Sequence, residues 1–165
     1  MHFEIYVVLS SDDLDRPAQE IVKEYKEKGK VPADVLQRVI SDLAPFNEAL
    51  EVEEEDCPEC DGDGEGCEVC GGTGLVPYNP NAEWDWWNIG GRWSKKDEDI
   101  WMAGGESSPE SAKKAPFAVL ADGEWTCLQS RFVKQEWLRD KAQAAWDKCV
   151  EEHQGDVVVR VDCHI

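Results

Sequence analysis

The chain has 165 residues, of which 36 are Asp or Glu and 17 are Lys or Arg, so its formal net charge at pH 7 is −19. A chain of this length can bury the core of one ordinary domain. The charge argues against unaided binding of nucleic acid, because a phosphate backbone would be repelled. It suits a monomer or small homo-oligomer, or a protein that docks on a basic partner.

The cellular setting follows from what the sequence lacks. No segment approaches the roughly 18 consecutive apolar residues of a membrane span. The N-terminus carries acidic residues almost at once and no basic region ahead of an apolar stretch, so we expect no signal peptide. Together these features predict a cytoplasmic protein.

The first third of the chain predicts one strand and two helices. Residues 3–9 are β-branched and aromatic, which is typical of a short buried strand. Pro17 can open a helix that ends at Gly29, and Pro32 can open a second helix that ends before Pro45. That second helix carries apolar residues at helical spacing on one face, namely Val35, Leu36, Val39, Ile40 and Leu43.

The last third predicts a hairpin, a long helix and a final strand. Residues 95–115 are polar and are expected to form an exposed loop. Residues 117–120 and 125–128 flank Asp122-Gly123, a strong hairpin signal. A helix is expected from Arg131 to about Glu151, with one apolar stripe and a strand over 157–161 after it. The stripe consists of Leu138, Ala142, Ala145, Trp146 and Cys149.

The order of these elements predicts an α+β fold. It matches the ferredoxin-like β-α-β-β-α-β arrangement, with residues 1–44 and 116–165 as the core. Residues 45–115 would form a long insertion between the first βαβ helix and the second strand. In that topology the first and last strands are antiparallel neighbours, so His2 should lie near Asp162 and His164.

Four cysteines of the insertion have the spacing of a metal site. Cys57, Cys60, Cys67 and Cys70 belong to C-x-x-C-x-G-x-G written twice within residues 57–74. Two C-x-x-C pairs can close tetrahedrally on one structural Zn²⁺. Glycine permits the positive φ angles of the tight turns between them. The alternative, a disulfide framework in a secreted protein, fits poorly without an export signal.

A tryptophan-rich segment, residues 84–93, is the predicted ligand-binding surface. Its candidate residues are Trp84, Asp85, Trp86, Trp87, Arg92 and Trp93. Arginine beside aromatic rings can hold a phosphate or carboxylate while the rings stack on a base, and Gly90-Gly91 would let the backbone approach a ligand. The alternative is a tryptophan-rich mini-core that pins the insertion, with Arg92 paired to Asp85.

His2, Asp162 and His164 complete the candidate site. His164 could finish a binding pocket together with His2, or it could act with Asp162 as an acid/base pair. The two histidines could also hold a second metal. The remaining cysteines, Cys127, Cys149 and Cys163, are expected to be small buried hydrophobes.

Two resemblances add to this interpretation. The two C-x-x-C-x-G-x-G units resemble the cysteine-rich region of DnaJ-type chaperones, which implies a zinc hairpin, although there is no J-domain His-Pro-Asp motif. The opening His2-Phe3, the Trp84–Trp93 segment and the closing Asp162-Cys163-His164-Ile165 look like a group of small uncharacterised proteins of bacteriophages and mobile elements. This likeness implies a viral or plasmid origin and a place in the host cytoplasm.

The resulting expectation is a zinc-stabilised, non-enzymatic protein that binds a small anionic aromatic ligand of nucleotide type. If a phage encodes this protein, it could have an anti-defence role, in which it sequesters a host immune signal. Two alternatives stay open: an acidic inhibitor of a host defence protein, and a nucleotide-degrading enzyme that uses His164 and carboxylates such as Asp162. No familiar catalytic motif supports the enzyme.

Overall fold

The computed structural model describes residues 1–106, 108–129 and 136–165. The chain divides into two compact units. The first consists of Met1–Asp42 and Trp87–His164, and the second of Leu43–Trp86 with Ile165. The second unit is thus shorter than the 45–115 insertion expected from sequence.

The first unit is built on a six-stranded sheet with β1 near its centre. The order is β4-β8-β1-β6-β7, and β5 also pairs with β8. β1 is antiparallel to β8 and parallel to β6. The strands are β1 (His2–Leu9), β4 (Trp86–Ile89), β5 (Ile100–Met102), β6 (Ala118–Ala121), β7 (Glu124–Cys127) and β8 (Val157–His164).

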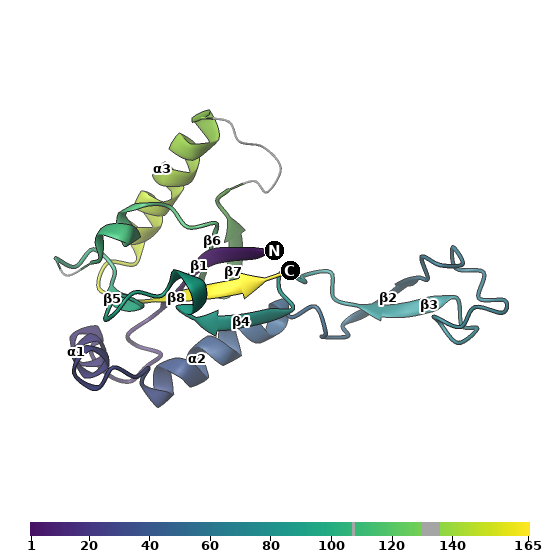
Figure 1. Ribbon diagram of the computed structural model, residues 1–165, viewed down its shortest axis with the longest axis horizontal. Helices are drawn as coiled ribbons and strands as arrows, with labels where there is room; N and C mark the ends of the chain where they lie inside the picture. Colours follow the sequence, from purple (N-terminus) through teal and green to yellow (C-terminus); the bar gives the residue numbers. More distant parts are fainter. Residues whose placement is uncertain (107, 130–135) are drawn as a thin grey trace. The chain divides into compact units, whose positions relative to one another are not determined.

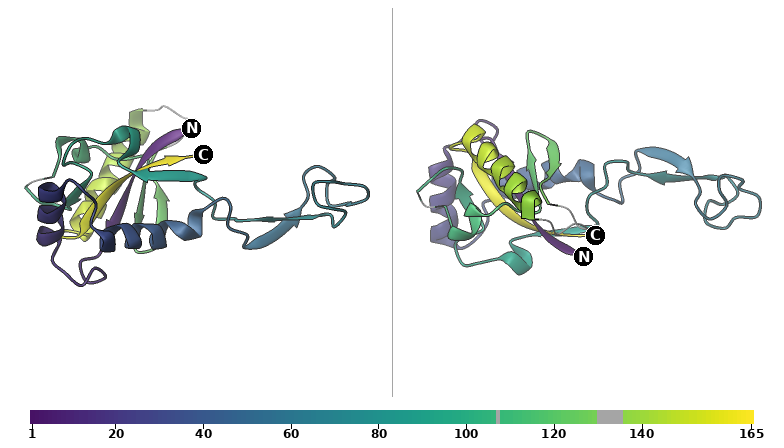
Figure 2. Two further views of the ribbon diagram at one scale, coloured as in Figure 1. Left: turned by 60° about the horizontal axis from the view of Figure 1, so that its bottom comes forward. Right: turned by 90° about the horizontal axis from the view of Figure 1, so that it is seen from above.

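Helices cover both faces of this sheet. α1 (Ala18–Lys28) and α2 (Ala33–Leu43) lie on one face, and α3 (Glu136–Glu152) lies on the other (Figures 1 and 2). Alternate residues of a strand point to opposite faces, so Tyr6 and Val8 join Trp146 of α3 in one apolar cluster. The described residues also include three short 3₁₀ turns, η1 (Ala44–Phe46), η2 (Gly91–Trp93) and η3 (Glu110–Lys113).

The structure confirms a mixed α+β fold and the antiparallel pairing of the first and last strands, with His2 opposite His164. It does not confirm the ferredoxin-like order, which would place β7 between β1 and β6. Instead β6 lies beside β1 and β7 forms the edge. Burial explains this order, because three of the four β6 residues are buried whereas β7 is mostly exposed. The apolar strand therefore takes the interior position and the polar strand the edge.

Three local expectations need correction. Leu36 and Ile40 of α2 are exposed rather than buried. The segment expected to be an exposed loop, residues 95–115, contains the buried strand β5 with Trp101 2% exposed. Cys127 is exposed, whereas Cys163 is buried as expected. The expected start of the last helix, residues 131–135, lies outside the described residues.

The second unit is a hairpin of β2 (Glu53–Asp56) and β3 (Leu75–Tyr78), in which Glu53 pairs with Tyr78. All four residues of β2 are exposed. Buried Asn79 holds the base of the hairpin by donating from its side-chain amide to the carbonyls of Pro45 and Asn47. Between Leu43 and Trp86 there are thirteen Asp or Glu residues and no Lys, Arg or His.

Among the described residues, no helix combines the length and the apolar character needed to cross a membrane.

Candidate functional site

The four predicted metal ligands come together in the second unit. One sulfur from each of Cys57, Cys60, Cys67 and Cys70 lies within 4.8 Å of the other three. The Cys57 and Cys67 sulfurs are 3.8 Å apart, and the Cys60 and Cys70 sulfurs are 3.9 Å apart. A Zn–S bond of about 2.3 Å gives a tetrahedron with edges of about 3.8 Å. The spacing of the sulfurs therefore fits one Zn²⁺.

The two cysteine repeats use their backbones in the same way. Gly64 donates its N–H to the Cys60 sulfur, and Gly74 donates its N–H to the Cys70 sulfur, both over 3.3 Å. Both glycines have positive φ, and a Cβ on either would overlap backbone atoms of the other repeat. N–H groups aimed at sulfur stabilise the thiolate form that a metal requires. The glycines of the motif are thus needed for the close approach of the two turns.

A second cluster of functional groups lies on the face of the first unit's sheet that α3 covers. Here Glu4 on β1 is directly opposite Asp162 on β8, and Tyr6 is opposite Arg160. Asp162 is 1% exposed and Arg160 is 0% exposed. Charges this deeply buried are tolerated only when they are paired and hydrogen-bonded.

Arg160 meets that requirement through two carboxylates and an aromatic ring. Its Nε lies 2.8 Å from Glu4 Oε1, and its Nη1 lies 3.4 Å from Asp99 Oδ1. Its guanidinium also sits 5.6 Å from the centre of the Trp101 ring, within the range of a cation–π contact. Sequence reasoning missed this residue, although an arginine inside the apolar run of residues 157–161 was a usable signal.

Burial changes the acidity of the groups around Arg160. Desolvation raises the pKa of Glu4 above its ordinary value, while the positive charge of Arg160 works in the opposite direction. Burial, and then the charge of Glu4, raise the pKa of Tyr6 well above that of a free tyrosine. Tyr6 therefore stays a neutral hydroxyl, which lies 3.3 Å from the Ser111 carbonyl oxygen and donates to it.

Asp162 joins His2 to the glycine-arginine turn. His2 Nδ1 lies 3.0 Å from Asp162 Oδ1, and the Arg92 backbone N–H donates to Oδ2 over 3.0 Å. The His164 ring packs edge-on against the His2 ring, with centroids 4.9 Å apart. The structure thus brings His2, Asp162, His164 and the backbone of Arg92 together at one end of β1 and β8.

Buried charged groups hydrogen-bond every residue of the segment Arg92–Lys95, which we call the anchored loop, through the backbone of Arg92, Trp93 and Lys95 and the hydroxyl of Ser94. Besides the Arg92 bond to Asp162, the Trp93 carbonyl accepts from Arg160 Nη1. The Lys95 N–H donates to Asp99 Oδ1, and the Ser94 hydroxyl donates to Asp99 Oδ2. The residues on either side of this loop are both bonded to the backbone of Arg160 on β8. The Gly90 N–H donates to the Arg160 carbonyl, and the Arg160 N–H donates to the Asp99 carbonyl.

The Gly90-Gly91 pair is explained by the same carboxylates. Both glycines have positive φ, 69° and 48°. A Cβ on Gly90 would overlap the Asp99 side chain, and a Cβ on Gly91 would overlap the Asp162 side chain. The glycines therefore let the backbone approach two internal carboxylates and not the ligand expected from the sequence.

The tryptophan-rich segment is split between the two units. Trp84, Asp85 and Trp86 belong to the second unit, and Trp87, Arg92 and Trp93 belong to the first. Trp84 is 8% exposed and its indole N–H donates to the Leu43 carbonyl, so it packs within its own unit. Asp85 and Trp86 are exposed there. In the first unit Trp87 is half-buried, while Arg92 and Trp93 are exposed.

Comparisons with protein-family models, with curated proteins and with solved structures found no match to this chain.

Proposed function

We propose that this chain is a zinc-stabilised, non-enzymatic binding protein whose anchored loop takes a small anionic aromatic ligand of nucleotide type. One observation carries the proposal. Each residue from Arg92 to Lys95 forms a hydrogen bond with a buried charged group, while the side chains of Arg92, Trp93 and Lys95 are exposed.

The cost of this arrangement supports a binding role. Burying Arg160, Asp99 and Asp162 takes three charges out of water, and such groups seldom add net stability to a fold. What they do supply is a loop whose conformation is set before any ligand arrives. Preorganisation of this kind raises affinity, because less conformational freedom is lost on binding.

The exposed side chains match an anionic aromatic ligand. Arg92, Lys95 and Lys96 place three cations within five residues of a strongly acidic chain, and all three are exposed. Arginine pairs with phosphate through two parallel N–H donors. The indole of Trp93, 39% exposed, offers a face on which a base can stack. His2, joined to the loop through Asp162, and His164, which packs against the His2 ring, add imidazole groups beside it.

The four cysteines supply the zinc part of the proposal. Structural Zn²⁺ sites contribute folding free energy directly, because the unfolded chain lacks the preformed ligand set. In a hairpin whose β2 is fully exposed, a metal would supply stability that an apolar core cannot.

A titration with mononucleotides tests the ligand. Wild-type protein and Arg92→Ala would be titrated with AMP, GMP, CMP and UMP while tryptophan fluorescence is followed. We expect a saturable change in the wild type and at least tenfold weaker binding by Arg92→Ala. Arg139→Ala, which removes an exposed arginine from α3, serves as the control and should bind as the wild type does. An absence of response across the panel would rule out the proposed ligand class.

The acidity of the second unit favours a second candidate function. Thirteen acidic residues without a base, together with the exposed side chains of Val52 and Val69, suit docking on a basic protein surface. Such a complex should weaken steeply between 50 and 300 mM salt.

The enzymatic alternative, with His164 and Asp162, predicts that mass spectrometry after the titration will detect altered nucleotide.

A further inference from the structure

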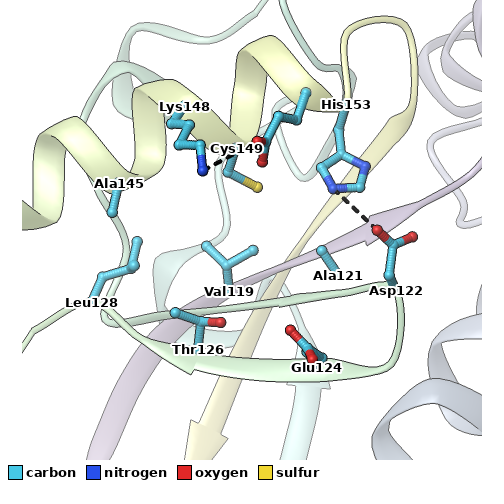
Figure 3. A pocket seen from close by; sticks show the side chains of 11 residues that line it. Val119, Ala121, Asp122, Glu124, Thr126, Leu128, Ala145, Lys148, Cys149 and His153 are labelled. Atoms are coloured by element: carbon cyan, nitrogen blue, oxygen red, sulfur yellow. Dashed lines mark ion pairs between the residues drawn. The ribbon is translucent and has the colours of Figure 1, made fainter.

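A groove separates the β6–β7 hairpin from the C-terminal half of α3 (Figure 3). Its volume is about 320 Å³, at the small end of the range for ligand pockets. The floor is formed by apolar or small side chains from both elements, namely Val119, Ala121, Leu128, Ala145 and Cys149. This site uses none of the residues of the anchored loop or of the cysteine cluster.

The groove exists because small residues face each other across it. On the hairpin, Val119 pairs with Thr126 and Ala121 pairs with Glu124, so these two strands present no large apolar side chain to the groove. On α3, Ala145 and Cys149 are four residues apart and therefore lie on one face of the helix. Side chains of this size leave space between helix and hairpin where a typical core would be filled.

Negative charge gathers at the rim. Asp122, Glu124 and Glu152 line the groove, and Asp122 and Glu152 are 78% and 57% exposed. Two side chains, one lysine and one histidine, lie beside these carboxylates. Lys148 lies 3.3 Å from Glu152, and His153 Nε2 lies 3.6 Å from Asp122, as the dashed line in Figure 3 shows. The other nitrogen of His153 faces Asp156 at 3.1 Å, so this ring is shared between two carboxylates.

The end of α3 adds to this negative potential. The helix ends at Glu152, and its last turn holds Glu151 and Glu152 but no basic residue. The unpaired carbonyls of a helix C-terminus carry partial negative charge and favour a cation. Burial raises the pKa of Cys149 to about 11, and the charges of Glu152 and Asp122 push it in the same direction. The negative charges of the rim carboxylates therefore act on Cys149 at the floor of the groove.

We propose that this groove binds a small aliphatic ammonium ion. The alkyl chain would lie on the apolar floor between Val119 and Cys149, and the ammonium group would meet Asp122, Glu124 and Glu152 at the rim. An anion would face the carboxylates and the helix carbonyls. A neutral apolar molecule would offer no positive charge to the carboxylates at the rim. This inference is independent of the nucleotide site proposed above.

The test compares three probes on the full-length protein. Butylammonium, 1-butanol and ammonium would be titrated separately, with backbone amide chemical shifts of the groove residues as the readout. Butylammonium supplies both charge and chain, 1-butanol supplies the chain alone, and ammonium the charge alone. We expect butylammonium to bind at least tenfold more tightly than either of the other two.

Substitutions distinguish binding by the rim carboxylates from a general effect of the protein's negative charge. The double variant Asp122→Asn/Glu152→Gln should weaken butylammonium binding at least fivefold; asparagine tolerates the positive φ at position 122. Glu151→Gln removes one charge from the same helix turn without touching the groove and should change binding less than twofold. Lys148→Met removes a competing cation and should tighten binding.

Three results would overturn the proposal. Equal affinity for butylammonium and 1-butanol would mean that the rim contributes nothing. An unchanged affinity in a folded double variant would remove Asp122 and Glu152 from the site. Weaker binding by Lys148→Met would show that this lysine contacts the probe, in contradiction to a site built for cations.

Discussion

Replacing Arg160 by methionine tests the buried network on which the anchored loop depends. Methionine keeps most of the side-chain volume and removes the charge. Buried Asp99 and half-buried Glu4 would then remain without their shared cation, and the Trp93 carbonyl would lose its donor. Removing one partner of a buried ion pair typically costs about 3–5 kcal/mol. We expect a loss of that size in the free energy of unfolding at pH 7.

The pH dependence of this loss has a definite sign. Burial already raises the pKa of Glu4, and Arg160 counteracts that rise. Without Arg160 the folded-state pKa of Glu4 rises further, so the folded variant binds this proton more tightly than the unfolded chain does. The destabilisation is therefore full above the raised pKa and shrinks as the pH falls toward the ordinary value of 4.5.

Urea unfolding of wild type and Arg160→Met at pH 7 and pH 5 measures both effects. The control is Arg139→Met, which removes an exposed arginine and should cost less than about 0.5 kcal/mol. A loss below about 1 kcal/mol for Arg160→Met, or the same loss at both pH values, would refute the reasoning from buried charge.

Three further predictions concern the metal centre, the glycine turn and the groove. Cys60→Ser should abolish stoichiometric zinc by elemental analysis and speed hydrogen exchange in residues 53–78; faster exchange only in the first unit's sheet would contradict the zinc assignment. Gly91→Ala should destabilise the first unit more than Gly29→Ala, measured by urea unfolding. Both glycines have positive φ, but only Gly91 would place a Cβ against another side chain. Cys149 should react with iodoacetamide at neutral pH far more slowly than a free cysteine, because partial burial and the charges of Glu152 and Asp122 raise its pKa to about 11; a rate that plateaus below pH 9 would contradict that rise.

Features set by local spacing could be predicted from the sequence. The two C-x-x-C pairs are six residues apart, and the structure gathers their four sulfurs as expected. Asp122-Gly123 forms the predicted hairpin turn, with both residues at positive φ. The meeting of His2 and His164 was also predictable, because it needed only the antiparallel pairing of the first and last strands.

Features that depend on non-local pairing could not be predicted in the same way. Which strand of the β6–β7 hairpin lies beside β1 is decided by competition for burial across the sheet, and hairpin signals do not report it. Strand β5 is three residues long inside a polar segment, and it forms because β8 offers an edge. Arg160 forms ion pairs with Glu4 and Asp99, which are distant from it in sequence, so its role could be recognised only from the fold.

The most direct test of the account compares AMP with adenosine by calorimetry at low salt. The two ligands share the base and sugar and differ only in the phosphate, which Arg92 and Lys95 are proposed to hold. We expect measurable binding of AMP and at least tenfold weaker binding of adenosine. Equal affinity for the two, or no binding of AMP, would contradict the claim that the anchored loop is an anion site.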